Sequence, residues 1–347
     1  MSIAFSWHGL PQYGARLIRG AMRRLGDFCL VVGSPPDVPV RGVEEALGTN
    51  VHWLAADEPA SWRGLGLDVP DVFVQSGWGY KAFNALGAEV KARGGRVIGL
   101  SDNNWRGDFR QIVLGAAAYR LLHRRRFDAM IVPGRQGERL MRWYGAPPRW
   151  TRTGMYGADP EIFNGGSPLP LRAKTFLFVG QFVARKDPLG LARAFVRFSQ
   201  QRPDWTLRLC GGGEQRGLIP RRPNIVVEGF VQPELLVERF RTARFFVLPS
   251  RMEAWGLVVH EAACCGCALV LSDRVGSADD LATPVNALRF RAGDEDDLLR
   301  TLICAADLDD ARLLSAEAES RRLARSFGPE RFGVEVAALI ADFLREA

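Results

Sequence analysis

Short apolar runs alternate with helical stretches along the whole chain of 347 residues. In the first half, the apolar runs predict strands at residues 3–7, 28–33, 51–55, 72–76, 96–101, 129–133 and 152–155, and helices fit between them at 15–25, 81–92, 107–126 and 136–144. In the second half, strands are predicted at 175–180, 206–210, 225–229, 245–248, 268–271 and 287–290, again separated by helices. Such alternation predicts an α/β fold with parallel sheets.

The stretch 161–173 is rich in turn-forming residues, with Asn164-Gly165-Gly166-Ser167-Pro168 followed by Pro170, and a new strand begins directly after it. Such composition is typical of a linker, and the chain length suits two domains of ordinary size. We therefore expect two doubly wound, Rossmann-like domains, 1–165 and 166–328, that face a cleft. Ligands of such sheets lie at the carboxyl ends of the strands.

The composition excludes several other classes of protein. No apolar run approaches the roughly 20 residues of a membrane span, and the N-terminus does not resemble a signal peptide. The six cysteines show no disulfide framework, so we expect a cytoplasmic protein. Cys264, Cys265 and Cys267 have no fourth ligand nearby and are interpreted as core residues, so no metal site is expected.

The net charge of +7 is concentrated in the first half of the chain. Residues 1–165 hold 21 basic and 15 acidic residues, whereas residues 166–347 hold 25 and 24. We expect this basic half to make a possible peripheral contact with an anionic membrane, or to bind a pyrophosphate-linked acceptor. The arginines concerned are Arg16, Arg19, Arg23, Arg24, Arg124, Arg125 and Arg126.

The stretch 248–273, LPSRMEAWGLVVHEAACCGCALVLSD, carries the strongest indication of chemistry. A strand there ends in a polar turn that contains glycine and opens a helix, which is how α/β folds present backbone N–H groups to a phosphate. Glu253 in the turn and Glu261 about one turn into the helix lie near this anion site. Carboxylates accept hydrogen bonds from hydroxyls in pairs, so a ligand with both phosphate and hydroxyls, a sugar nucleotide, is predicted.

This stretch resembles the donor-binding segment of the retaining glycosyltransferases of the GT-B fold, family 4 type. There, two glutamates eight residues apart flank a Gly-aromatic-Gly-Leu turn; Ala254 replaces the first glycine here. The resemblance implies that Glu253 contacts the transferred sugar and Glu261 the ribose, while the amides from Trp255 through Gly256 and Leu257 to Val258 receive the phosphates. It also implies that a C-terminal helix, within 329–347, crosses back to the first domain.

The segment after the first strand of the second domain is similar to the family's phosphate-binding loop. The family has Gly-Arg at the strand end and a lysine five residues after that arginine; Lys186 falls on the lysine position, and Gln181 on the arginine position. The resemblance implies that Lys186 holds the donor diphosphate. Neighbouring Arg185 is expected to compensate for the charge that Gln181 lacks.

Four further positions complete the expected site. Gly212, in a run of three glycines, permits close approach of a ligand. Phe230 and Val231 resemble the loop that holds the nucleobase, although Phe230 could equally pack in the core. Gly14 either reaches the donor or forms the turn before the first helix.

Asp102 lies at a strand end where the family often has a histidine that contacts the transferred sugar. It either takes over this contact or caps the helix that follows.

The resemblance implies a metal-independent hexosyltransferase that needs no cofactor. It would move a sugar from a nucleotide-diphosphate sugar to a carbohydrate or lipid-linked acceptor, in polysaccharide or glycolipid synthesis, without binding nucleic acid. The alternative is a degenerate GT-B protein that binds an anionic polymer or membrane surface without transfer. A third possibility is a GT-B enzyme of different outcome, such as an epimerase or a phosphorylase. The resemblance implies that Glu253→Ala abolishes transfer with the fold intact.

Overall fold

The computed structural model describes residues 1–26, 29–36 and 42–346, and the chain divides into two compact units. Unit 1 comprises 1–159 and 327–347, and unit 2 comprises 160–326. The junction after Asp159 lies six residues before the predicted boundary, at the start of the glycine- and proline-rich stretch. The chain returns to unit 1 at Phe327, two residues before the helix predicted at 329.

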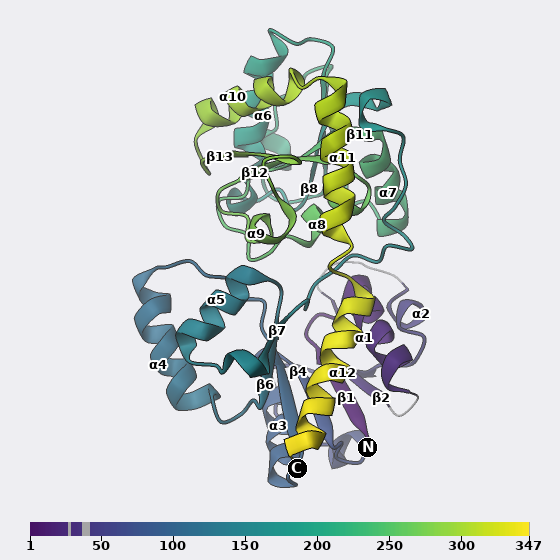
Figure 1. The fold of residues 1–347 in the computed structure, drawn as a ribbon, viewed down its shortest axis with the longest axis vertical. Coiled ribbons are helices and arrows are strands. Elements are labelled where there is room, and N and C mark those ends of the chain that lie inside the picture. The colour runs from purple at the N-terminus through teal and green to yellow at the C-terminus, as the bar shows by residue number, and fades with distance from the viewer. Residues whose placement is uncertain (27–28, 37–41, 347) are drawn as a thin grey trace. The chain divides into compact units, whose positions relative to one another are not determined.

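Unit 1 is built on a parallel sheet of seven strands in the order β3-β2-β1-β4-β5-β6-β7 (Figure 1). The strands are β1 (Ile3–Trp7), β2 (Cys29–Gly33), β3 (His52–Trp53), β4 (Val72–Ser76), β5 (Arg96–Leu100), β6 (Ala129–Val132) and β7 (Thr151–Thr153). The helices are α1 (Gln12–Leu25), α2 (Val43–Leu47), α3 (Lys81–Ala92), α4 (Ala116–Ala118), α5 (Arg135–Tyr144) and α12 (Pro329–Glu346). Helix α4 is continuous with π-helical turns at Arg110–Gly115 and Tyr119–His123, which together form the helix predicted at 107–126.

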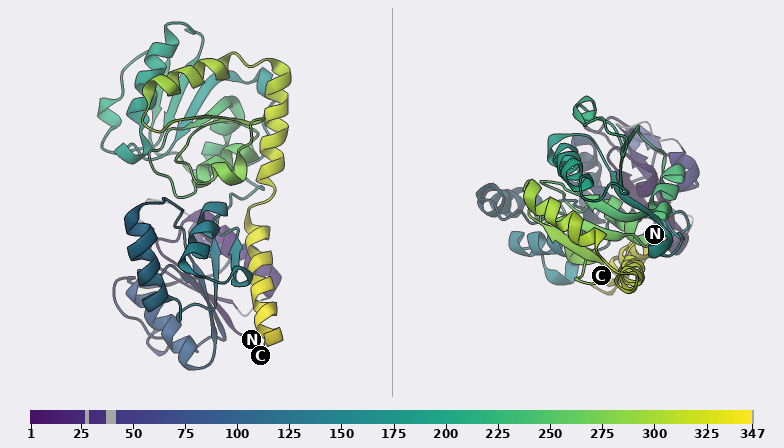
Figure 2. Two further views of the ribbon diagram at one scale, coloured as in Figure 1. Left: turned by 60° about the vertical axis from the view of Figure 1, so that its left-hand side comes forward. Right: turned by 90° about the horizontal axis from the view of Figure 1, so that it is seen from above.

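Side chains alternate between the two faces of this sheet, and each face has its own core. Phe5 and Val74 point toward α1 and α12, which pack side by side (Figures 1 and 2). Phe73 and Val97 point to the other face, toward α3, α4 and α5. Because successive strand residues point to opposite faces, buried parallel strands need apolar residues on both.

Unit 2 contains a parallel sheet of six strands in the order β10-β9-β8-β11-β12-β13. The strands are β8 (Ala173–Val179), β9 (Thr206–Cys210), β10 (Ile225–Glu228), β11 (Ala243–Leu248), β12 (Ala268–Ser272) and β13 (Ala287–Phe290). The helices are α6 (Pro188–Ser199), α7 (Pro233–Thr242), α8 (Leu257–Cys264), α9 (Ala278–Leu281), α10 (Glu295–Ala306) and α11 (Asp310–Ala324). Aromatic rings fill much of the core; Phe176, for example, stacks on Trp205 with ring centroids 4.6 Å apart.

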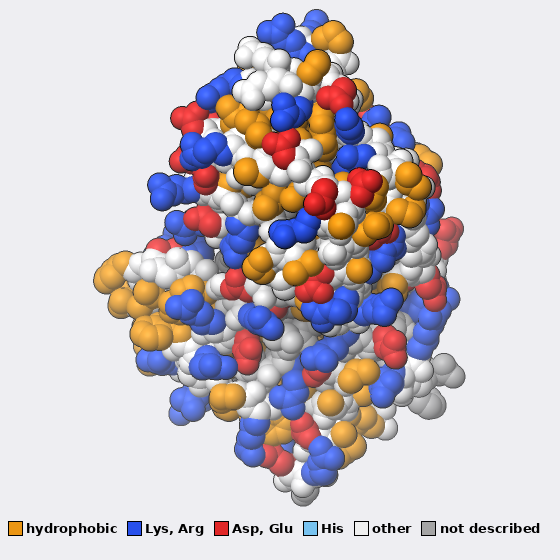
Figure 3. All heavy atoms as spheres, turned by 45° about the horizontal axis from the view of Figure 1, so that its top comes forward, with side chains coloured by type: hydrophobic (Ala, Val, Ile, Leu, Met, Phe, Trp, Pro, Cys, Tyr) orange, Lys and Arg blue, Asp and Glu red, His pale blue; other side chains and the backbone are white. Residues whose placement is uncertain are grey.

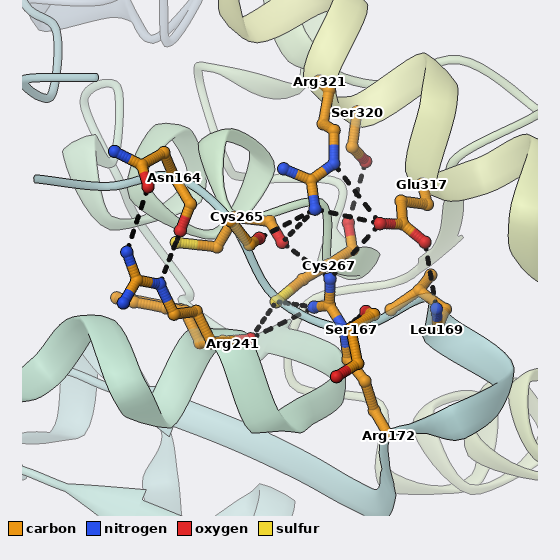
Figure 4. A network of polar contacts seen from close by, with 12 residues as sticks. Asn164, Ser167, Leu169, Arg172, Arg241, Cys265, Cys267, Glu317, Ser320 and Arg321 are labelled. Carbon is orange, nitrogen blue, oxygen red and sulfur yellow. Dashed lines mark hydrogen bonds and ion pairs between the residues drawn. The ribbon is translucent and has the colours of Figure 1, made fainter. Parts of the chain in front are cut away.

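A buried arginine ties together several segments of unit 2 (Figure 4). The Arg172 side chain, just before β8, donates to the carbonyl oxygens of Ser167 at 2.6 Å and Cys265 at 2.8 Å, and to that of Phe240 at 3.2 Å. Glu317 on α11 lies 3.5 Å from the same guanidinium. This hydrogen bonding compensates for taking a guanidinium out of water.

Candidate functional site

The two strands at the centre of the unit 2 sheet, β8 and β11, mark the point where the strand order reverses. The chain leaves β8 toward β9 on one side, and leaves β11 toward β12 on the other. The loops after these two strands therefore diverge at their carboxyl ends, which is where doubly wound sheets bind ligands.

A buried ion pair joins these two loops. The ammonium Nζ of Lys186, from the loop after β8, contacts Oε2 of Glu253, from the loop after β11, and each residue is only 9% exposed. The hydroxyl of Ser250 donates to the same carboxylate oxygen at 3.3 Å. The structure thus brings together two predicted site residues that lie 67 positions apart in the sequence.

The backbone around Lys186 is held in an uncommon conformation. Asp187 has a φ of 52° and is the single non-glycine residue with positive φ in the described part of the chain. Its carboxylate accepts from the N–H of Gly190 at 3.3 Å, which caps α6, and from Nε of Arg251 at 3.2 Å. The N–H of Arg251 donates to the carbonyl of Arg185 at 2.7 Å, so the two loops are linked through their backbones as well.

The turn before α8 leaves the first backbone N–H groups of this helix available to a ligand. Gly256 has a φ of 91°, and a Cβ there would lie 3.0 Å from Cγ of Glu253. Helix α8 follows at Leu257, and the N–H groups of Leu257 and Val258 in its first turn have no earlier helical carbonyl to bind. The Trp255 side chain is buried in the core, where Nε1 donates to Asp280 at 2.9 Å, so only the backbone of Trp255, the part that the prediction assigned to the phosphates, can meet a ligand.

Glu261 lies in α8 one turn after Leu257, as its spacing predicted. Burial raises the pKa of its carboxyl group to about 7. The residue is half-buried, and its carboxylate has no hydrogen bond or ion pair with another described residue. A desolvated carboxylate without a partner is an acceptor available to a ligand.

The glycine run after β9 packs against the loop after β8. A Cβ on Gly211 would lie 1.9 Å from the carbonyl oxygen of Gly180, and one on Gly213 would lie 2.6 Å from that of Phe182. These two glycines are therefore needed for loop packing. Gly212 faces open space, and its carbonyl accepts from the N–H of Phe182 at 2.8 Å.

The other predicted residues of unit 2 border these loops. Phe230 is half exposed, so it does not pack in the core, and Val231 beside it is partly buried. Gln181 and Arg185 are both exposed, and the guanidinium of Arg185 donates to Oε1 of Gln181 at 3.1 Å. The side-chain amide of Gln181 therefore holds the guanidinium of Arg185 next to the position where the resembled family has its own arginine.

In unit 1, Gly14 and Asp102 have surroundings that the sequence did not reveal. Helix α1 begins at Gln12, not near residue 15, and Gly14 lies within its first turn, where a Cβ would be 3.0 Å from the ring of Trp7. This close packing accounts for the glycine. Asp102 is exposed and accepts from the hydroxyl of Tyr156 at 3.4 Å, and the helix that follows is capped instead by Asp108, which accepts from the N–H of Gln111 at 2.8 Å.

A polar group at the carboxyl ends of β1, β2 and β4 was missed at the level of sequence. The ring of His8 stacks on Tyr80 with centroids 3.9 Å apart, and its Nδ1 lies 3.0 Å from the hydroxyl of Ser34. The backbone N–H of His8 also donates to the hydroxyl of Ser76 at 3.3 Å. The signal was a histidine and a serine that each follow a predicted strand, His8 and Ser34, and a second serine, Ser76, that ends one.

Among the described residues, no cluster of three or more His, Cys, Asp or Glu could hold a metal ion. Burial raises the pKa of the Cys267 thiol to about 11, and its sulfur donates to the carbonyl of Phe240 at 3.2 Å. Within the same described ranges, the helices are too short or too polar to cross a membrane.

Residues 161–312 match the family described as "Glycosyl transferases group 1". The D-inositol 3-phosphate glycosyltransferase of Corynebacterium kroppenstedtii is 28% identical over 218 residues, which cover 55% of this chain and 48% of that protein. The protein of the same name from Geodermatophilus obscurus is 30% identical over 236 residues, 61% of this chain and 51% of its own. The chain thus spans about half the length of the curated relatives it matches.

Two solved structures resemble the whole chain. Anabaena HepE, crystallised in complex with UDP and glucose, has a TM-score of 0.74 at 14% identity and covers 98% of this chain and 99% of its own. Sucrose-phosphate synthase from Thermosynechococcus elongatus has a TM-score of 0.75 at 17% identity, with full coverage of both chains. With its two parallel-sheet units, the chain has the GT-B fold that the sequence predicted.

Proposed function

We propose that this chain, whose residues 161–312 match the family described as "Glycosyl transferases group 1", moves a sugar from a nucleotide-diphosphate sugar to an acceptor hydroxyl. The observation that carries the proposal is the buried pair of Lys186 and Glu253 at the point where the strand order of unit 2 reverses. Anabaena HepE, which has a similar fold, binds UDP and glucose, and this supports a nucleotide sugar as the donor.

Lys186 and the first turn of α8 are suited to the diphosphate. The departing group gains negative charge as the bond between the anomeric carbon and its oxygen breaks. An ammonium group and N–H groups fixed in place before the reaction stabilise this charge without reorganisation. Glu253 holds the ammonium in position when no donor is bound, and its carboxylate accepts from hydroxyls of the sugar when the donor enters.

Glu261 is suited to the ribose, because a carboxylate can accept from two neighbouring hydroxyls. Phe230, half exposed beside the glycine loop, offers an apolar surface for the base. We propose a reaction with retention of configuration, in which the acceptor oxygen attacks from the face that the diphosphate leaves. The acceptor proton then passes to the departing phosphate oxygen, so neither a covalent nucleophile nor a metal ion is required of the protein.

The acceptor is proposed as a carbohydrate, a polyol phosphate or a lipid-linked sugar. The relatives named D-inositol 3-phosphate glycosyltransferase make inositol 3-phosphate one acceptor to test.

The test is a panel of UDP-, GDP- and ADP-sugars offered with inositol 3-phosphate, a polyprenyl phosphate sugar and water as acceptors. Release of the nucleoside diphosphate and the anomeric configuration of the product are measured. Transfer by the wild type and a loss of about 100-fold or more in Glu253→Gln are expected, because an interaction with the transition state is removed. Specific thermal stabilisation by a donor without turnover on any acceptor would instead favour a binding protein.

A further inference from the structure

The helical segment of unit 1 that contains α4 exposes apolar side chains on its outer side. Five side chains between residues 109 and 122 form this apolar ridge: Phe109 is 73% exposed, Val113 44%, Leu114 58%, Leu121 82% and Leu122 62%. The space-filling view shows an apolar projection at the left, where α4 lies in Figure 1, with basic side chains below it (Figure 3). Exposed apolar patches of this kind usually mark an interaction surface.

The fold of unit 1 does not require the ridge to be apolar. The opposite side of the same helical segment already supplies its share of the core, through Ala116 and Tyr119. A surface helix normally carries polar residues on its outer side. Trp143 on α5 extends the ridge: it is 45% exposed, and its indole N–H donates to the carbonyl of Ile112 at 3.0 Å.

The charges at the end of the ridge are all positive. Residues 109–127 contain no aspartate or glutamate, and Arg110, Arg124, Arg125 and Arg126 are exposed without an ion pair to another described residue. Exposed arginines elsewhere are commonly neutralised; Arg193 and Arg197 on α6, for example, pair with Glu295 and Asp296. The ridge therefore combines exposed apolar area with uncompensated positive charge.

The structure also corrects the basic surface expected from the sequence. Helix α1, which carries Arg16, Arg23 and Arg24, packs on one face of the sheet, while the segment 110–123 packs on the other. Arg16 is moreover paired with Asp159 at 3.1 Å. The two groups of arginines therefore cannot form one binding surface.

We propose that the apolar ridge, with Arg124 and Arg125 at its end, docks this protein on an anionic lipid bilayer. The apolar side chains would enter the boundary between headgroups and acyl chains while the arginines meet lipid phosphates, as in helices that lie in the plane of a membrane. A second copy of the chain fits the surface poorly, since a symmetric contact would bring the unpaired arginines of both copies together. The proposal does not depend on the transferase activity proposed above.

The experiment measures binding of the full chain to vesicles of phosphatidylcholine alone or with 30% phosphatidylglycerol. We expect binding to the anionic vesicles, and a partition coefficient lowered by at least about tenfold in Leu121→Ser/Leu122→Ser, because two exposed apolar side chains are removed. Arg124→Gln/Arg125→Gln is expected to lower the partition coefficient roughly 25-fold, because each arginine near an anionic surface contributes to the free energy of binding.

Matched controls are available in the same chain. Leu171→Ser/Leu218→Ser removes two leucines of unit 2 that are 77% and 66% exposed, and Arg23→Gln/Arg24→Gln removes two exposed arginines of α1. Both controls are expected to bind as the wild type does. Unchanged binding in the ridge variants, an equal loss in the controls, or equal binding to neutral vesicles would overturn the proposal. So would a concentration-dependent dimer in sedimentation that the ridge variant abolishes.

Discussion

Replacing Lys186 and Glu253 singly and together measures how strongly their ion pair stabilises the fold. Each residue is 9% exposed, so removal of one partner leaves a buried charge without its counter-ion. Such a loss typically costs about 3–5 kcal/mol, whereas replacement of both charges by neutral groups costs far less. We expect Lys186→Met and Glu253→Gln each to lower the free energy of unfolding by about 3 kcal/mol. The double variant should lose less than the sum of the two.

The coupling is measured by urea denaturation of the full chain, with Lys174 and Asp204 as the matched control pair. These two residues also belong to unit 2, and their charged atoms are 2.5 Å apart, but their side chains are 49% and 52% exposed. Exposed pairs contribute about 0–1 kcal/mol. A coupling between Lys186 and Glu253 as small as that of the control pair would refute the reasoning. The buried pair also means that Glu253→Ala and Glu253→Gln both destabilise unit 2, so transfer by either variant is compared with the wild type under conditions in which the variant is folded.

The same variants distinguish a structural role from a role in binding the donor. Lys186→Met should abolish the increase in Tm that a bound nucleotide sugar gives the wild type, because binding stabilises the folded state by mass action. Lys174→Met should keep this increase. A full increase in Tm with Lys186→Met would contradict the role proposed for Lys186.

Three further predictions follow from the environments of single residues. Burial holds the pKa of Glu261 at about 7, so affinity for UDP-glucose should rise between pH 6 and 8 as the carboxylate forms. Titration calorimetry should find that the affinity of Glu261→Gln does not change with pH. If its affinity still rises with pH, ionisation of Glu261 is not the cause. Burial lowers the pKa of His260 to about 4, so the histidine protonates more readily in the unfolded chain. The free energy of unfolding should therefore fall as the pH is lowered from 6.5 to 4. In urea denaturation, His260→Asn should lose less of its free energy of unfolding over this range than the wild type. Arg172→Lys should lower the free energy of unfolding by about 3 kcal/mol, because one ammonium cannot reach all the carbonyls that the guanidinium binds (Figure 4). A change as small as that caused by Arg322→Lys, at an exposed ion pair, would contradict this reasoning.

Much of the fold could be predicted because local patterns carry it. Apolar runs of four to six residues gave most of the strands, including β1 and β11, since a buried parallel strand needs apolar side chains on both faces. The residues at which helices and strands begin could be predicted less well. Helix α1 begins three residues before the predicted start because Pro11 provides a favourable first turn and Gly14 packs on Trp7, a contact that no local pattern shows.

The structure brings two of the predicted site residues, Lys186 and Glu253, together, and the roles assigned to the site residues stay predictions. Lys186, Glu253 and Glu261 were recognised by their positions after strands and by the resemblance of their surroundings. For Trp255 the prediction concerned only the backbone amide, and the structure adds that the side chain is buried in the core with its Nε1 donating to Asp280. For Phe230 the opposite holds, since its exposure leaves it available to a ligand.

The sequence by itself determined the candidate residues and their place beside predicted strands, because strand ends, glycine turns and the spacing of Glu253 and Glu261 are local properties of the chain. Only the tertiary structure decided how these residues are paired and protonated. Lys186 and Glu253 meet because the order of strands places β8 beside β11, and Glu261 has a raised pKa because the surrounding fold excludes water from it. The arginines of α1 and those after α4 are separated by the thickness of a sheet, a distance that the sequence does not contain.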